Sequence, residues 1–125
     1  MSLFDDFAAE KHFEGRTRFL LSLARTLPLL DSKSASDEVS GCEAKTWLHL
    51  DTSTGRVNLR GDSEARIVKG LMALLFSLFE GLPVKDAKAV DARKAFEQAG
   101  LARFLSPSRS NGLYAMLERI EQGLA

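Results

Sequence analysis

Apolar residues recur along this chain with two different periods, and the change of period separates helical segments from extended ones. Between residues 10 and 27 they recur every three or four positions, which predicts an amphipathic helix that Pro28 ends. The apolar face of this helix is formed by Phe13, Leu20, Leu23, Ala24 and Leu27. The following residues 30–39, LDSKSASDEV, are rich in Ser and Asp and predict a polar loop.

A period of two is found in the next two segments. KTWLHL (residues 45–50) and RVNLR (residues 56–60) each alternate between two sets of side chains, as strands with two different faces do. The residues between them, DTSTG, are typical of a turn, so the two segments predict a β-hairpin. DEVS, residues 37–40, predicts a third strand just before the hairpin.

The segment GDSEARIVKGLMALLFSLFEGLP, residues 61–83, predicts the central helix of the fold. Asp62 or Ser63 is expected to cap its N-terminus, and Glu64 is expected in its first turn. Gly81 and the proline after it are expected to end it. The run GLMALLFSLF within it is apolar on nearly every side, which predicts burial between a sheet and other helices. This run is far shorter than the roughly 20 apolar residues of a membrane-spanning helix.

The rest of the chain predicts further helices. Two short ones are expected at residues 84–89 and 91–99, and a longer one begins at SPSRSNGL, residues 106–113. The apolar face of the last helix is formed by Leu113, Met116, Leu117, Ile120 and Leu124. No repeat or linker divides the chain, so we expect one domain over residues 1–125. The predicted class is α+β, with a small antiparallel sheet of about three strands packed against helices.

Charge and composition argue against several classes of partner. Of the 125 residues, 45% are hydrophobic, and 17 basic residues balance 17 acidic ones to a formal net charge of zero. No overall positive field attracts nucleic acid or an anionic membrane, so neither is expected as a partner. The N-terminal MSLFDDFAAEKHF is acidic where a signal peptide requires basic residues, which predicts a cytoplasmic protein. One Cys and two His are too few for an ordinary structural zinc site, and we expect no metal or other cofactor.

The single cysteine, Cys42, lies in the polar stretch EVSGCEAKTW, residues 38–47. A free cysteine is usually a small buried apolar side chain, but the neighbouring Gly41 and Glu43 indicate an exposed loop. A hydrolase nucleophile needs a base within about 2.6–3.2 Å, whereas an extended segment would separate His49 from Cys42 by about 20 Å. The chain has no second cysteine to form an intramolecular disulfide. Any group that bonds to Cys42 must therefore come from, and leave to, another molecule.

Several other side chains have both a structural and a functional interpretation. Trp47 is expected to be a packing aromatic rather than a ligand-stacking one. Arg60, Arg66 and Lys69 lie near the start of the central helix, but acidic residues are interleaved with them, which predicts a solvated, salt-bridged face. In SPSRSNG the serines and the proline are explained by a helix start. A helix start does not explain Arg109, whose guanidinium could lower the pKa of a nearby thiol or bind a partner's carboxylate.

Three segments resemble, in the same order, the SufE/CsdE family of sulfur acceptors for cysteine desulfurases. They are VSGCEAKTWLHL, GDSEARIVKGLMALLF and LSPSRSNGLYAMLERI, and they extend from residue 39 to residue 120. The combined motifs are specific: Gly-Cys with Trp five positions after the Cys, Gly-Asp-Ser-x-Ala-x-Ile-Val-x-Gly, and Pro-Ser-Arg-x-x-Gly. The resemblance implies an IscU-like α+β fold with Cys42 on a loop beside the sheet.

The resemblance also implies a function for the cysteine. A pyridoxal-phosphate cysteine desulfurase, SufS- or CsdA-like, holds sulfur as a persulfide, and Cys42 would accept this sulfur and pass it to an iron–sulfur scaffold or another acceptor. The protein would then be an accessory activator of the desulfurase rather than a stand-alone enzyme, and pyridoxal phosphate would belong to the partner. The supporting and partner-contact residues implied by position are Gly41, Glu43, Trp47, Glu64 and Arg109.

The sequence departs from the family pattern beside the cysteine. It reads Gly-Cys-Glu-Ala where family members usually have Gly-Cys-Gln-Ser, and Thr46 replaces the more usual Val. The charge of Glu43 would raise the pKa of the thiol, whereas Lys45, or Arg109 if it lies near, would oppose this effect.

Shelter of the sulfur is a further expectation, because a persulfide must be protected from reductants in water. We therefore expect Cys42 to fold back against apolar residues of the hairpin and to swing out when a partner docks. The residues also leave a different class of function open. In that alternative the protein is a non-catalytic interaction module, and the hairpin with the helix start at Ser106–Gly112 binds an acidic partner.

Overall fold

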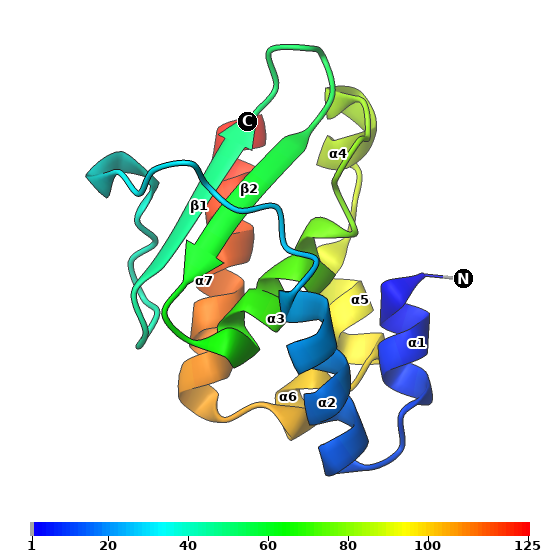
Figure 1. Cartoon of the computed structure of the whole chain (residues 1–125). Helices are drawn as coiled ribbons and strands as arrows, with labels where there is room; N and C mark the ends of the chain where they lie inside the picture. The colour runs from blue at the N-terminus through cyan, green and yellow to red at the C-terminus, as the bar shows by residue number, and fades with distance from the viewer. Residues whose placement is uncertain (1) are drawn as a thin grey trace.

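Helix α3 (Arg66–Phe76) lies at the centre of the structure, which is a computed structural model that describes residues 2–125 (Figure 1). Helix α2 (Phe13–Ala24) packs along one side of α3, and α7 (Pro107–Leu124) packs along another. The remaining elements are α1 (Leu3–Ala9), a 3-10 turn η1 (Ala35–Asp37), β1 (Thr46–Asp51), β2 (Asn58–Ser63), α4 (Val84–Lys88), α5 (Ala92–Gln98) and α6 (Leu101–Phe104). The fold class is α+β, as predicted.

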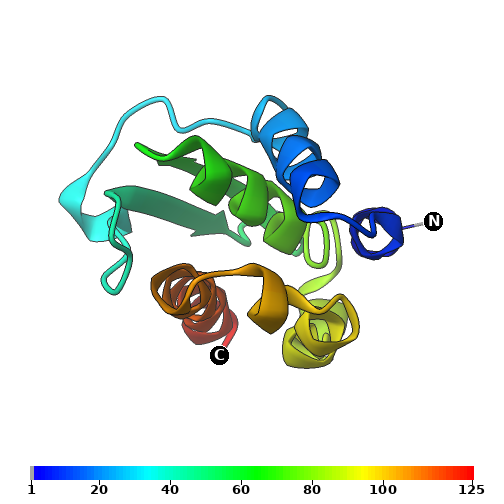
Figure 2. The same ribbon diagram turned by 90° about the horizontal axis from the view of Figure 1, so that it is seen from below.

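Strands β1 and β2 form an antiparallel hairpin that packs against α3 and α7 (Figures 1 and 2). The face of the hairpin that packs against these helices carries three cross-strand pairs, which are Thr46 with Ser63, Leu48 with Gly61, and Leu50 with Leu59. The helices lie very close to this face, because a Cβ on Gly61 would overlap Met72 of α3, and a Cβ on Gly123 of α7 would lie 2.5 Å from Leu50 Cδ2. Glycine at these positions therefore allows the close approach of sheet and helices.

The opposite face of the hairpin is covered by the loop over residues 28–37, which crosses in front of the strands in Figure 1. The Lys33 ammonium lies 5.0 Å from the centroid of the Trp47 ring. Asp37 Oδ1 lies 3.1 Å from His49 Nδ1. Trp47 is only 9% exposed, so its role in packing is confirmed.

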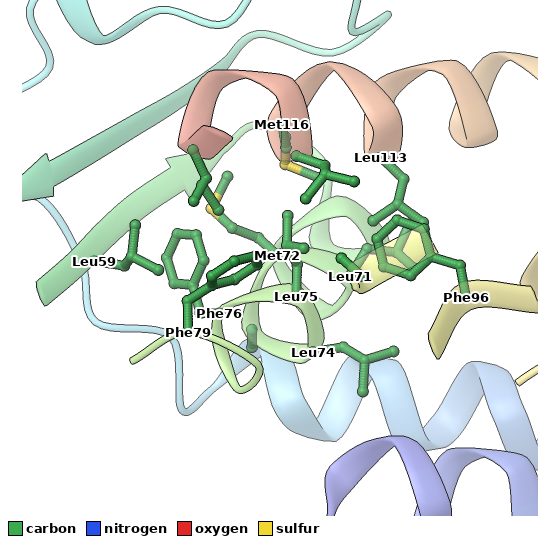
Figure 3. Close-up of a cluster of buried hydrophobic side chains, with 14 of the residues drawn as sticks. Leu59, Leu71, Met72, Leu74, Leu75, Phe76, Phe79, Phe96, Leu113 and Met116 are labelled. Atoms are coloured by element: carbon green, nitrogen blue, oxygen red, sulfur yellow. The ribbon is translucent and has the colours of Figure 1, made fainter. Parts of the chain in front are cut away.

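The hydrophobic core surrounds α3. Residues 71–76 of this helix are all buried, as predicted for an all-apolar helix. Figure 3 shows how side chains from β2, α5 and α7 meet those of α3, and the labelled partners are Leu59, Phe96, Leu113 and Met116. A Cβ on Gly70 would overlap the backbone of Leu20 in α2, so glycine permits the close crossing of α2 and α3.

The predicted third strand is wrong. In its place Glu38 forms a single antiparallel bridge to Trp47, and no ladder continues from it among residues 2–125. The bridge nonetheless fixes the chain beside β1 just before the cysteine.

The predicted start and end of the central helix are also wrong, since α3 ends at Phe76 with Ser77 as its C-cap, before Gly81 and Pro83. Strand β2 continues through Asp62 to Ser63, so neither residue caps α3. The N-cap is Ala65, which has no side-chain cap, and Glu64 therefore precedes the helix. Pairing with β1 takes precedence over the local capping signal at these positions.

The N-terminal region contains two helices where one was expected. Helix α2 begins at Phe13, whose side chain is 65% exposed, so its assignment to the buried face is wrong. Helix α1 was not predicted, although Ser2 and Asp5 form a capping box at its start and its Phe7 is fully buried. Helices α4, α5 and α7 confirm the predictions for residues 84–89, 91–99 and the last helix.

Candidate functional site

Residues 40–45 form a short loop with a fixed base. The Val39 N–H donates to the Thr46 carbonyl at 2.8 Å, which closes the loop. Beneath it the buried hydroxyls of Thr46 and Ser63 are 3.0 Å apart, and Ser63 Oγ donates to the Lys45 carbonyl at 3.2 Å. The base is thus bound to both strands, whereas most residues of the loop itself are exposed. This arrangement favours movement of the loop on a rigid support.

The thiol at the tip of this loop rests against α7. Cys42 is half-buried, and its Sγ donates to the Gly112 carbonyl at 3.7 Å. A Cβ on Gly112 would lie 3.3 Å from Sγ, so a larger residue there would press on the thiol. Gly41 has φ +95°, which glycine adopts without strain. The loop is exposed and its thiol folds back onto the protein, as predicted, but the thiol packs on α7 rather than on the hairpin.

Cys42 lines a pocket of about 350 Å³ between its own loop and the helices α3 and α7. The pocket has an apolar floor and a polar rim. The apolar residues are Ala44, Ala65, Val68, Leu71, Leu113 and Met116, and the polar ones are Glu43, Ser108 and Arg109. An apolar cavity with a few polar groups at its edge is typical of a binding site.

Burial controls the protonation of the thiol. It raises the pKa of Cys42, because the thiolate loses hydration in the pocket, and a hydrogen bond from Thr46 lowers the pKa by a smaller amount. The contact with the Gly112 carbonyl also favours the protonated form, because only the thiol can donate to it. In this position Cys42 is a protonated, weakly nucleophilic group. Burial, rather than the expected charge of Glu43, is the principal cause.

The rim residues connect the loop to the start of α7. Ser108 Oγ donates to Glu43 Oε2 at 3.2 Å. Arg109 lines the same pocket as Cys42, and its backbone N–H donates to the capping Ser106 Oγ at 3.4 Å. The helix start and the cysteine loop are thus brought together, as the predicted role of Arg109 requires.

Other predicted residues lie outside the pocket. The Glu64 side chain is exposed and does not line it, although the Glu64 N–H donates to the Lys45 carbonyl at 3.0 Å. His49 contacts Asp37 on the far side of the hairpin. Among residues 2–125 no histidine lines the pocket of Cys42, so the structure places no imidazole beside the thiol.

Two contacts of the site, those of Arg119 and Gly112, were not predicted from the sequence. Arg119 of α7 donates to the Glu38 carbonyl at 3.1 Å and also to the Ser36 carbonyl, so it fixes the chain that leads into the loop. A partly buried helix arginine that binds backbone carbonyls far away in the sequence leaves no sequence pattern. Gly112 belongs to the Pro-Ser-Arg-x-x-Gly motif, but its contact with the thiol becomes evident only in the folded chain.

Comparison with known proteins agrees with this geometry. The family model described as Fe-S metabolism associated domain, SufE, matches residues 1–124. The chain belongs to the SufE family. An uncharacterised SufE-like protein of Rhizobium etli is 36% identical over 96% of this chain and 85% of that protein. A second such protein, from Rhizobium meliloti, is 34% identical over 95% of this chain and 89% of its own length.

A solved structure has the same fold. The solution structure of a hypothetical protein from Thermus thermophilus matches with a TM-score of 0.81 and 26% identity, over 97% of this chain and 89% of that one. Membership of the SufE family connects this chain to iron–sulfur metabolism. Within residues 2–125, no helix is long and apolar enough to cross a membrane, and no three acidic, His or Cys side chains are grouped as metal ligands.

Proposed function

We propose that this SufE-family protein accepts sulfur on Cys42 from the persulfide of a cysteine desulfurase and thereby stimulates that enzyme. The donor is a SufS- or CsdA-like enzyme that uses pyridoxal phosphate, and the sulfur passes to an iron–sulfur scaffold or another acceptor. The protein is then an activator in the cytoplasm and has no resident cofactor. Its own contribution to the chemistry is one thiol and the loop that moves it.

The transfer is an exchange at sulfur. The Cys42 thiolate attacks the outer sulfur of the partner's persulfide, a new S–S bond forms on Cys42, the old S–S bond breaks, and the partner's thiolate leaves. The thiol proton of Cys42 is lost before attack, and no electrons enter or leave the pair of proteins. Because the chain has no second cysteine, no resolving thiol of its own can attack the product.

The pocket supports a cycle with a resting and an extended state. At rest the thiol is half-buried and protonated, which limits side reactions with alkylating agents and oxidants. When the loop moves outward, the thiol regains water, and its pKa falls toward the ordinary range. Outward movement of the loop therefore also activates the thiol. The Glu43–Ser108 hydrogen bond is exposed and single, so it opposes this movement only weakly.

The observation that carries the proposal is the position of the single cysteine of the chain, on a loop with a fixed base and beside Arg109. It is tested by measuring L-alanine formation by a cysteine desulfurase with increasing amounts of wild-type protein or Cys42→Ser. Stimulation by the wild type alone supports the proposal. Equal stimulation by both would instead support the interaction module formed by the hairpin and Ser106–Gly112, in which the thiol has no part.

A further inference from the structure

A second pocket, away from the cysteine, lies between α2 and the N-terminal part of α3. Its volume is about 530 Å³. The lining residues of α2 recur at helical spacing along one face, and those of α3 come from its first turn. The residues that line it are Arg18, Leu21, Ser22, Ala24 and Arg25 of α2 and its C-cap, Leu27 and Leu29 of the next segment, and Arg66 and Lys69 of α3. We call this pocket the basic groove.

Positive charge is concentrated in the basic groove although the whole chain is neutral. Four cationic side chains line it, and no acidic side chain from the described part of the chain does. Lys69 Nζ is paired with Asp62 at 3.2 Å, so the predicted salt-bridged face is confirmed for Lys69, whereas no ion pair within residues 2–125 involves Arg60 or Arg66. Within residues 2–125, however, no acidic group lies within ion-pair distance of Arg18, Arg25 or Arg66. The groove therefore presents three uncompensated guanidinium groups.

The same groove contains exposed apolar surface. Leu29 is 51% exposed, which is unusual for a large aliphatic side chain in this protein, and Leu21 and Leu27 lie beside it. Arginines around exposed aliphatic groups are typical of protein–protein interfaces, whereas Lys is less frequent there. Nucleic-acid surfaces are more polar and usually supply aromatic rings for stacking, and no aromatic residue among those described lines the groove. The favoured occupant is an acidic protein segment with an apolar side chain.

The basic groove and the cysteine pocket share one helix. Ala65 and Val68, at the start of α3, line the cysteine pocket, whereas Arg66 and Lys69 in the same turn line the groove. A protein that docks over Cys42 and covers the start of α3 therefore reaches the groove as well. An interface of standard size buries about 800 Å² and roughly 20–30 residues on each partner, which is more than the residues of one pocket.

We infer that the basic groove is a second docking site for the sulfur-donating desulfurase, which inserts a segment carrying Asp or Glu with a neighbouring apolar side chain. This inference rests on the proposed function of Cys42. The groove contributes affinity and orientation and takes no part in the exchange of sulfur. Its arginines bind the carboxylates, and Leu29 packs against the apolar side chain of the segment.

The test uses the full chain, a cysteine desulfurase and L-cysteine, and it measures the initial rate at which Cys42 gains sulfur against the concentration of this protein. The test variant is Arg18→Glu/Arg25→Glu, in which both changes lie at exposed positions of α2 and its C-cap. We expect the half-saturating concentration to rise about tenfold or more, with an unchanged maximal rate. The control, Lys85→Glu/Arg103→Glu, changes net charge equally at exposed sites outside both pockets, and it should shift half-saturation less than about twofold.

A second variant removes contact area without changing charge. Leu29→Ala should raise half-saturation several-fold, and its exposed side chain makes unfolding no explanation for the loss. Unchanged half-saturation in both groove variants, or an equal shift in the control, would overturn the inference and leave the proposed function standing. A lower maximal rate at unchanged half-saturation would overturn it too. If the wild type gains no sulfur, the proposed function fails, and the inference fails with it.

Discussion

The contact between Cys42 and Gly112 allows the resting position of the thiol to be changed by a single methyl group. In Gly112→Ala the new Cβ would lie 3.3 Å from Sγ and 3.8 Å and 3.9 Å from Cα and Cβ of Cys42. Only the 3.3 Å contact is shorter than an ordinary one, so Sγ must move by a few tenths of an ångström, and the exposed loop that carries it is the partner that can move. The substitution should therefore shift the thiol toward its extended state without disturbing the core.

The size of the effect follows from two opposing contributions. Replacing glycine in a helix interior by alanine stabilises by about 1 kcal/mol, while displacing a half-buried thiol and its weak hydrogen bond costs on the order of 1 kcal/mol. The unfolding free energy should thus change by less than about 1 kcal/mol. The cost of about 1 kcal/mol for crowding the thiol applies only to the resting state. It therefore raises the extended population roughly five- to tenfold, because about 1.4 kcal/mol corresponds to a factor of ten.

Alkylation of the free protein by iodoacetamide, followed by intact mass, measures this population. We expect the rate for Gly112→Ala to exceed that of wild type roughly five- to tenfold, at nearly unchanged melting temperature. The control is Asn111→Ala, which changes an exposed residue of the same helix turn and should leave the rate unaltered. A wild-type alkylation rate in Gly112→Ala would show that this contact does not hold the thiol at rest.

Three further predictions concern the loop and its protonation. Arg119→Ala removes the hydrogen bonds to residues 36 and 38, so Cys42 should be alkylated a few times faster at a stability cost of about 1 kcal/mol; an unchanged rate would show that this anchor does not restrain the loop. Arg109→Ala should slow sulfur transfer in a desulfurase assay while leaving alkylation of the free protein unchanged, and normal transfer would remove Arg109 from the site. Because the folded state raises the pKa of Cys42, the folded protein retains the thiol proton where the unfolded chain has lost it. This stabilising contribution is complete below the unfolded pKa and is lost as pH rises through the folded one, so urea unfolding should show wild type losing stability relative to Cys42→Ser as pH rises above the ordinary thiol pKa of about 8.5; a constant difference would contradict the raised pKa.

Local patterns in the sequence predicted those elements whose own residues determine them. The hairpin and the buried α3 follow from periodicity, and α7 follows from periodicity together with its Ser106 cap. The start of α3 was misplaced because pairing with β1 extends β2 over residues that also suit an N-cap. The predicted third strand was wrong because only Glu38 pairs with β1. The residues after Val39 leave β1 and form the cysteine loop.

The motifs identified the cysteine and the helix start, but the sequence did not reveal what holds the thiol. Glycine at position 112 leaves room for the resting thiol of Cys42, which is 70 residues away in the sequence, and no local pattern contains that contact. Likewise, the sign of the pKa shift depends on burial in a pocket that three separate segments form. Charges near Cys42 in sequence therefore suggested the wrong principal cause.

The most direct measurement is the intact mass of the protein after incubation with a cysteine desulfurase and L-cysteine, recorded with and without a thiol reductant. We expect a gain of one sulfur atom that the reductant removes and that Cys42→Ser does not acquire. A wild-type mass that remains unaltered while the desulfurase turns over, or the same gain in Cys42→Ser, would contradict it.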